Sequence, residues 1–267
     1  MISKIFYTIL LLCPLISICI PKDTLSTIVI PVAITTPTCA YLQTQTTTTP
    51  TTLNMSVLGT SAYYGVLAHG KIDGATPLTI YGSVGSLAAI NLNSPYHVYG
   101  GTVHAVNDAY TISALNDAGT AYTSLSIPPG TTQVPTFLTG APIQLGTYYF
   151  NSLITLAGGL VINLDYNNIT DAVWIFRING YNYGWFCKVQ FVTGGLAFNV
   201  YWQISGYCAL AANVIMIGNI VSQGYITMAA SASLKGIALS VNDYITITGT
   251  ATSVYFAHKF WINYYIL

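Results

Sequence analysis

The sequence predicts an all-β dominated fold, a β-solenoid accompanied by one α-helix. Its 21 Tyr residues, together with abundant Thr, Val and Ile, favour strands. Short strand-like segments recur at a nearly constant step in the second half of the chain. A helical spacing of apolar residues occurs instead over residues 103–124.

The composition excludes some classes of function. Charged residues make up 5% of the chain, Glu is absent, and the seven acidic residues balance the seven basic ones. Without a basic stripe there is nothing to neutralise phosphates, so nucleic acid is not a predicted partner. Low charge is also typical of membrane proteins, but beyond the N-terminus Gly, Thr, Ser and Asn interrupt every apolar stretch.

Residues 1–20 are interpreted as a signal peptide or an N-terminal anchor. Lys4 supplies a positive charge, and the apolar run Ile5 to Ile20 follows it. Ile18-Cys19-Ile20 lacks the small residues of a cleavage site, so both alternatives stay open. We expect a secreted protein, or a membrane-anchored or particle-surface protein if this segment is retained; the membrane is a partner only in the second case.

The remaining chain divides by composition into a linker, a folded domain and a tail. Residues 21–52 are predicted as a linker, because residues 35–52 are rich in Thr and have no apolar periodicity. The solenoid domain is expected over residues 53–255, and an aromatic C-terminal tail over residues 256–267.

The first part of the domain predicts short strands followed by the helix. Apolar runs separated by Gly, Pro and Asn lie at Tyr64 to Leu67, Leu78 to Tyr81 and Leu87 to Leu92. The helical stripe then begins with Val103, Val106 and Tyr110, and Ile112, Leu115 and Tyr122 continue the helical pattern. Thr102 is the expected N-cap, and Pro128-Pro129-Gly130 ends the region.

The second part predicts stacked coils. Two segments with a similar pattern follow each other in this part of the chain: Tyr225-Ile226-Thr227-Met228 and Tyr244-Ile245-Thr246-Ile247. Nearly the same number of residues separates the first of them from the preceding segment Cys208-Ala209-Leu210. Val189-Gln190-Phe191 lies one further step back. Such a repeat is typical of a solenoid in which each strand lies on its equivalent in the next coil.

A series of ordered motifs resembles the ice-binding-protein-like β-solenoid family, found in microbes of cold habitats. Five segments follow the family's order around one helix, over roughly residues 55–250. They are Leu58-Gly59-Thr60-Ser61 with Gly65 to Ala68; Gly100-Gly101-Thr102-Val103-His104-Ala105; Asp171 to Ile178; Asn199 to Ile204; and Gly218-Asn219-Ile220 with Ser222, Ile226-Thr227 and the Gly236 strand.

The resemblance implies an irregular right-handed β-solenoid (β-helix) of triangular cross-section with one long α-helix packed alongside. It also implies activity through one flat face, with the surface of an ice crystal as the partner. His104 lies in the segment entering the helix, where a buried, hydrogen-bonded structural role is expected. The sequence departs from the family at Leu145, where Pro is common, and in its low charge and aromatic tail.

A candidate ice-binding face follows from strand alternation. If Ile226, Met228 and their equivalents point inward, the residues between them point outward. The predicted site consists of Gln190, Ala209, Ala211, Thr227, Ala229, Thr246 and Thr248, with Val192 beside Ala211. Two interpretations stay open. These residues form an ice-binding surface, or they are only the Thr and Ala residues that any exposed solenoid strand carries.

The leading hypothesis is a secreted ice-binding protein that limits ice growth. The alternative is a non-catalytic structural or adhesive surface protein that contacts components of a cell or virion. The Thr-rich stretch and the aromatic tail favour attachment and so support the alternative.

No enzyme is predicted, and no catalytic residue, metal or cofactor. The histidines show no metal-ligand spacing, and Asp165 and Asp171 flank Asn167-Asn168 as turn residues do. Candidate glycosylation sites are Asn54 and Asn168. Cys187 and Cys208 are separated by a little more than one coil and form a candidate disulfide.

Overall fold

The computed structural model describes residues 9–12, 15–18, 55–75, 77–126, 132–133, 142–151, 154–156, 161–165, 172–180, 182–184, 188–193, 197–248 and 252–255. The chain divides into two compact units, residues 1–45 and 46–267. In the first unit the described residues form an antiparallel pair of strands, β1 (Ile9–Leu12) and β2 (Leu15–Ile18). No helix within these ranges is long and apolar enough to cross a membrane. The limits of the signal segment, linker and tail stay predictions.

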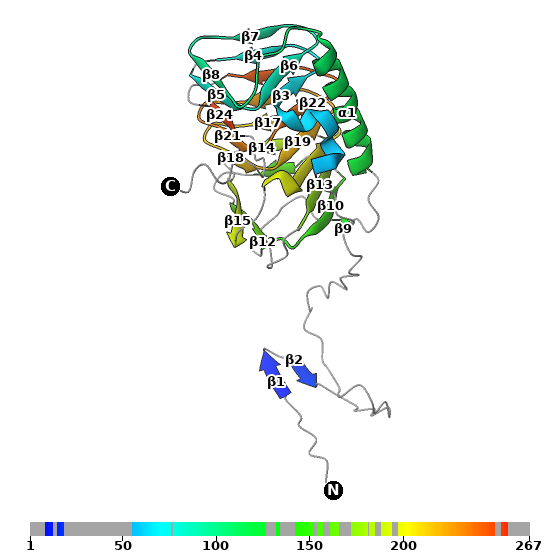
Figure 1. Cartoon of the computed structure of the whole chain (residues 1–267). Coiled ribbons are helices and arrows are strands. Elements are labelled where there is room, and N and C mark those ends of the chain that lie inside the picture. The colour runs from blue at the N-terminus through cyan, green and yellow to red at the C-terminus, as the bar shows by residue number, and fades with distance from the viewer. Residues whose placement is uncertain are drawn as a thin grey trace. The chain divides into compact units, whose positions relative to one another are not determined.

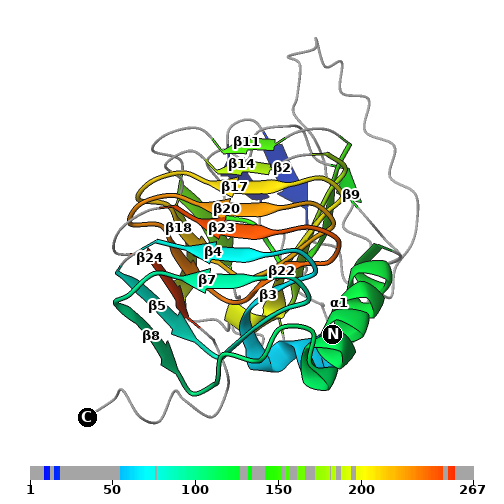
Figure 2. The same cartoon turned by 90° about the horizontal axis from the view of Figure 1, so that it is seen from above.

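The second unit is a β-solenoid, as predicted. Its described strands form three parallel sheets, and successive coils contribute one strand to each sheet (Figure 2). One long α-helix runs along the stack beside the first sheet (Figure 1), which confirms the predicted accessory helix. The helices of the described residues are η1 (Met55–Tyr63), α1 (Ala109–Ser126) and η2 (Ala197–Asn199).

We number the sheets 1 to 3. Sheet 1 contains, in spatial order, β6 (Ser83–Ser86), β3 (Tyr64–Ala68), β22 (Ala238–Ser240), β19 (Asn219–Ser222), β16 (Val200–Ile204), β13 (Trp174–Ile178), β10 (Gly146–Phe150) and β9 (Thr132–Gln133). Sheet 2 contains β11 (Ile154–Leu156), β14 (Asn182–Gly184), β17 (Cys208–Leu210), β20 (Ile226–Met228), β23 (Ile245–Ile247), β4 (Ile72–Gly74) and β7 (Ile90–Leu92). Sheet 3 contains β12 (Val161–Asp165), β15 (Lys188–Thr193), β18 (Ile215–Ile217), β21 (Ser233–Lys235), β24 (Thr252–Tyr255), β5 (Leu78–Tyr81) and β8 (Tyr96–Tyr99).

The order of the strands explains the length of α1. The last coil in the sequence stacks on the first, because β22 pairs with β3. The chain must therefore return along the stack before it builds the coils from β10 onward. The 18 residues of α1 cover about 27 Å at about 1.5 Å per residue. The path from β6 to β10 crosses six strand steps, or about 29 Å at about 4.8 Å each.

The interior of the solenoid is filled by alternate strand residues. On sheet 2, the residues expected to point inward are at most 1% exposed, which confirms the alternation there. Large aromatic side chains fill the wider coils, where the rings of Phe176 and Trp202 stack at 4.2 Å between centroids. The Trp202 indole N–H donates to the Ile217 carbonyl at 2.8 Å, so its polar atom is also satisfied. The confirmed inward residues are Cys208, Leu210, Ile226, Met228, Ile245 and Ile247.

A second apolar cluster lies between sheet 1 and α1. Ala114, Ala118 and Ala121 lie on the buried face of the helix together with Leu115 and Leu125, and the small alanine side chains allow it to pack closely on the strands. They contact residues such as Leu67 and Leu239 on the outer surface of sheet 1. The strands of sheet 1 beside the helix, β3, β13, β16, β19 and β22, are therefore mostly buried on both sides, which leaves sheets 2 and 3 to face solvent.

The predicted helix lies in the right region, but its predicted start was wrong, and only the later part of the predicted stripe packs. The helix begins at Ala109, so Val103 and Val106 precede it. These two side chains are 40% and 48% exposed, and Tyr110 is 74% exposed. The predicted Leu115 and Tyr122 do pack against sheet 1, beside an alanine face that was not predicted. Apolar spacing in the sequence does not distinguish a small buried face from a larger exposed one.

Stacked glycines form a corner where the chain enters sheet 1 from sheet 3. Gly236 adopts φ 157°, and an added Cβ would lie 2.0 Å from the Gly218 carbonyl oxygen in the adjacent coil. Gly119, in the middle of α1, has open space by comparison, since its added Cβ would meet only Val241 at 3.8 Å.

We predict that Gly236→Ala lowers the free energy of unfolding by about 2–3 kcal/mol, because the backbone is strained for an L side chain and the coils must separate. The matched variant Gly119→Ala should raise it by about 0.5–1 kcal/mol through helix propensity. Urea unfolding of both variants measures the difference. Equal effects of the two substitutions would contradict the stacked corner.

Candidate functional site

The middle residues of the sheet 2 strands form an outward row. β17, β20 and β23 each bury their first and third residues and leave the second partly exposed. Backbone pairing places Ala209 opposite Thr227 and Thr227 opposite Thr246. The predicted neighbours are therefore brought together in a straight line across three coils, as Figure 2 allows the reader to follow from β17 to β23.

A second row runs beside the first, two residues further along each strand. The Ala229 N–H donates to the Leu210 carbonyl, and the Thr248 N–H donates to the Met228 carbonyl, both one coil away. This continues the register beyond the strands themselves. Thr248 is exposed, Ala229 is half-buried, and Ala211 packs partly against the core. We call these two rows the threonine–alanine strip: Ala209, Ala211, Thr227, Ala229, Thr246 and Thr248.

Tyrosines flank the strip on its other side. Tyr207, Tyr225 and Tyr244, here called the tyrosine row, stand one above another in successive coils. Their ring centroids lie 4.5 and 5.1 Å apart, and the ring planes differ by 9° and 4°. Such stacking holds the rings in one orientation and gives the strip a straight edge. The sequence shows the repeated Tyr, but the spacing alone does not identify it as part of the face.

The placement of Gln190 beside Ala209 is wrong. Tyr183 of β14 is the register partner of Ala209. Gln190 belongs to β15 in sheet 3, where its side-chain amide donates to Asn163 Oδ1 at 2.9 Å, and Val192 lies on the same strand. The cause is a longer coil: more chain separates Asn182 from its partner Cys208 than separates Cys208 from Ile226, so a constant step back from Cys208 falls on sheet 3 instead.

Sheet 3 is a less suitable face than the part of sheet 2 formed by β17, β20 and β23, because its outer surface carries charged residues. Lys188 and Lys235 are exposed there. On β21 the burial of Leu234 between two more accessible neighbours shows that Lys235 points outward. Strongly hydrated ammonium groups oppose close contact with an uncharged surface. Of the described outward residues on the two sheets, those of the threonine–alanine strip therefore suit contact with an uncharged surface better.

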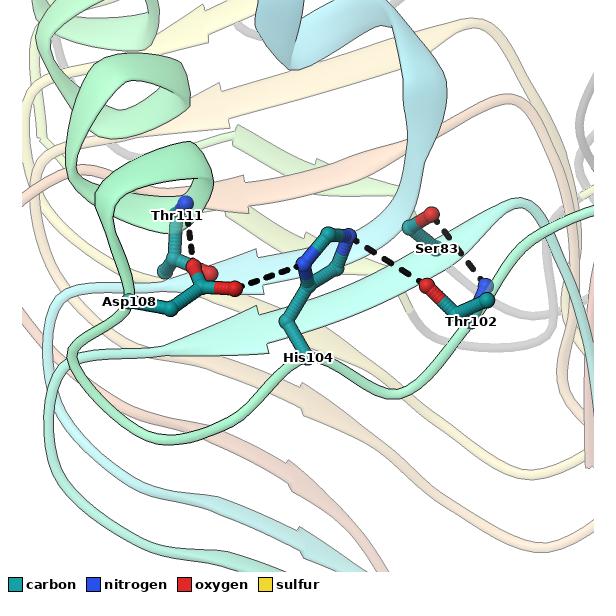
Figure 3. Close-up of polar contacts among 5 residues, drawn as sticks. All are labelled: Ser83, Thr102, His104, Asp108 and Thr111. Atoms are coloured by element: carbon teal, nitrogen blue, oxygen red, sulfur yellow. Dashed lines mark hydrogen bonds and ion pairs between the residues drawn. The ribbon is translucent and has the colours of Figure 1, made fainter.

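A polar cluster lies at the start of α1 (Figure 3). His104 Nδ1 lies 2.8 Å from Asp108 Oδ2, and the other oxygen of Asp108 accepts the Thr111 N–H at 2.6 Å. Asp108, rather than the predicted Thr102, is thus the N-cap of the helix. Thr102 instead lies 3.5 Å from His104 Nε2, and its N–H donates to the Ser83 hydroxyl at 3.3 Å. The expected hydrogen-bonded structural role of His104 fits this arrangement, although the side chain is only partly buried, at 18% exposure.

The charge of Asp108 matters for the cap. The Thr111 side chain, then the Thr111 N–H and His104, lower the pKa of the Asp108 carboxyl, while desolvation opposes them. A lowered pKa in the folded state means that the carboxylate stabilises the fold above its unfolded pKa of about 3.9. That stabilisation is lost as the pH falls through the lowered value.

We predict that Asp108→Ala lowers the free energy of unfolding by about 1 kcal/mol at pH 7, since the first turn of α1 loses its cap. The difference from the unmodified chain should shrink as the pH falls below about 4. Thermal unfolding over a pH series measures it. A difference that stays constant down to the most acid pH would contradict the charged cap.

The remaining candidate residues are only partly placed. Cys208 is buried on the core side of β17, whereas Cys187, Asn54 and Asn168 lie outside the described residues. The disulfide and both glycosylation sites stay predictions. Within the described part of the chain, no group of three or more His, Cys, Asp or Glu side chains could hold a metal ion.

Together these features define a class: a parallel β-solenoid with a helix along one side and in-register rows of uncharged side chains on another. The chain belongs to the ice-binding-like family, whose model matches residues 42–253. An ice-binding protein of Colwellia sp. is 27% identical over 200 residues, which cover 68% of this chain and 78% of the relative. One from Nostoc sp. (strain HG1) is 28% identical, with 73% and 72% covered.

Solved structures agree on the fold. The crystal structure of an ice-binding protein from an Antarctic biological consortium matches with a TM-score of 0.67 at 21% identity, and covers 87% of this chain and all of that one. An ice-binding protein from an Antarctic Flavobacteriaceae bacterium matches with a TM-score of 0.60 at 28% identity, and covers 74% of this chain and 46% of that one.

Proposed function

We propose that this protein binds the surface of ice crystals through the threonine–alanine strip and thereby limits ice growth. The observation that carries the proposal is the register of β17, β20 and β23 and of the residues that follow them, which aligns the strip in two rows. Membership of the ice-binding-like family supports it, as do relatives that are themselves named ice-binding proteins.

The chemistry of the strip suits a crystalline water surface. Ice presents a regular lattice, so a binding surface must be flat, rigid and regularly spaced. In-register parallel strands fix the repeat at about 4.8 Å along each row. The Thr side chain is short, β-branched and restricted at χ1, and it presents a methyl and a hydroxyl. The Ala methyl projects little from the surface. Uncharged groups of this kind order water without holding it as tightly as an ammonium or a carboxylate does.

The proposal includes action outside the cell and without catalysis. The apolar segment Ile5 to Ile20 behind Lys4 supports a secretory route, with cleavage or anchoring both compatible. Binding through a flat strip requires no nucleophile, cofactor or metal. The partner is then the ice crystal itself.

The test is thermal hysteresis and ice-recrystallisation inhibition with the full chain, beside the variants Thr227→Tyr and Thr246→Tyr. Both threonines belong to the first row, and a tyrosine at either position projects from the strip and separates it from a flat surface. We expect each variant to need at least roughly tenfold more protein for the same inhibition, as when about 1.4 kcal/mol of contact is lost.

The matched control is Thr79→Tyr, which makes the same change on sheet 3. Thr79 is half-buried between Leu78 and Ile80, so it also points outward. The control should retain activity. Loss in the control with retention in the strip variants would move the ice-binding surface to sheet 3. A folded chain without any activity would refute ice binding and favour the structural or adhesive hypothesis.

A further inference from the structure

Sheet 2 continues beyond the threonine–alanine strip, but its outer surface changes at one step. Ile245 pairs with Ile72 and Ile72 pairs with Ile90, so β23, β4 and β7 follow one another in unbroken register (Figure 2). In the same step Thr246 is followed by Asp73, and Asp73 by Asn91. The backbone of the face therefore extends further than its uncharged side chains.

The side chains on β4 and β7 form a connected polar group, here called the polar boundary: Lys71, Asp73 and Asn91. Lys71 Nζ lies 2.5 Å from Asp73 Oδ2. The Asn91 side-chain amide donates to Asp73 Oδ1 at 2.8 Å. The side chains of Lys71 and Asp73 are 52% and 30% exposed, so the ion pair lies at the surface of the face.

Both groups of this ion pair are charged at neutral pH. The hydrogen bond with Asp73 raises the pKa of Lys71. The hydrogen bonds from Lys71 and then Asn91 lower the pKa of Asp73. Surface charges of this kind hold their hydration water, and removing it costs free energy that an exposed ion pair does not return.

The register shows what the polar boundary replaces. Lys71 follows Tyr244 in the tyrosine row, since the Ile245 N–H donates to the Lys71 carbonyl. Asp73 follows Thr246 in the first row of the strip. Ala75 continues the second row of the strip, since its N–H donates to the Ile247 carbonyl. At β4 and the residues directly beside it, Lys71 and Asp73 interrupt the pattern and Ala75 maintains it.

We infer that the polar boundary ends the ice-binding surface at β23 and so sets its length, and hence the strength with which the protein binds ice. The inference rests on the proposed function. It assigns Lys71 and Asp73 the role of limiting the site to three coils. Without these two side chains, the site could extend over a fourth coil with no change to the backbone.

The test is the double variant Lys71→Tyr/Asp73→Thr, which continues the tyrosine row and the first row of the strip into the next coil. We expect roughly two- to fivefold less protein to be needed for the same recrystallisation inhibition, because one more strand contacts ice. Lys71→Gln/Asp73→Asn removes the charges with little change in side-chain size. It should give a smaller gain in the same direction and covers the case in which the first variant does not fold.

Two controls separate the possible causes. Lys71→Asp/Asp73→Lys keeps the ion pair with its charges exchanged and should leave activity unchanged. Tyr225→Lys/Thr227→Asp copies the pair into the middle of the strip and should abolish activity. Circular dichroism and thermal unfolding confirm that each variant is folded.

The outcomes distinguish the two proposals. If the copied pair abolishes activity and the charge-free variants bind ice more strongly, the polar boundary limits the site. If the copied pair abolishes activity but the folded charge-free variants show no gain, the boundary role is refuted and the strip remains the ice-binding surface. If the copied pair leaves activity intact, the strip is not the site and both proposals fail.

Discussion

Parallel hydrogen bonding between equivalent strands of successive coils is the constraint on which the rest of this structure depends. Each coil sits one strand spacing, about 4.8 Å, above the last. A side chain at a given position therefore meets its equivalent in the next coil: Ile226 on Ile245 inside, Thr227 on Thr246 outside. The core, the outer rows and the stacked tyrosines all follow from this pairing. A slip of one residue in one coil would exchange the inner and outer side chains there.

The same constraint makes the helix necessary. Because the first coils of the sequence lie beside the last, the chain must cross the stack once, and α1 covers that distance. The helix also buries the apolar side chains on the outer surface of sheet 1, because its alanine face covers them. Asp117 of the helix accepts two hydrogen bonds from Thr60, each at 2.6 Å, and so ties η1 to the same side. One element thus closes one face, and the chain is left with two faces for contact with its surroundings.

Local repetition explains how much of this could be predicted from the sequence. The strands at Cys208, Ile226 and Ile245 follow one another at the predicted step and stack as expected. The prediction failed where the coil length changed, between Asn182 and Cys208. Val189 and Phe191 alternate with polar residues just as the sheet 2 strands do, so the pattern alone does not say to which sheet they belong. The start of α1 was missed for a related reason, because the choice between Thr102 and Asp108 as the cap depends on the path of the intervening loop.

The central claim, that a flat strip created by coil stacking adsorbs to ice, can be tested without reference to its consequences for crystal growth. A fluorescent-protein fusion of the full chain would be allowed to adsorb to a single ice crystal as it grows. The account predicts fluorescence on defined planes of the crystal, and its disappearance when Thr227→Tyr and Thr246→Tyr are combined in a folded fusion. Ice that excludes the unmodified fusion, or that retains the double variant on the same planes, would contradict it.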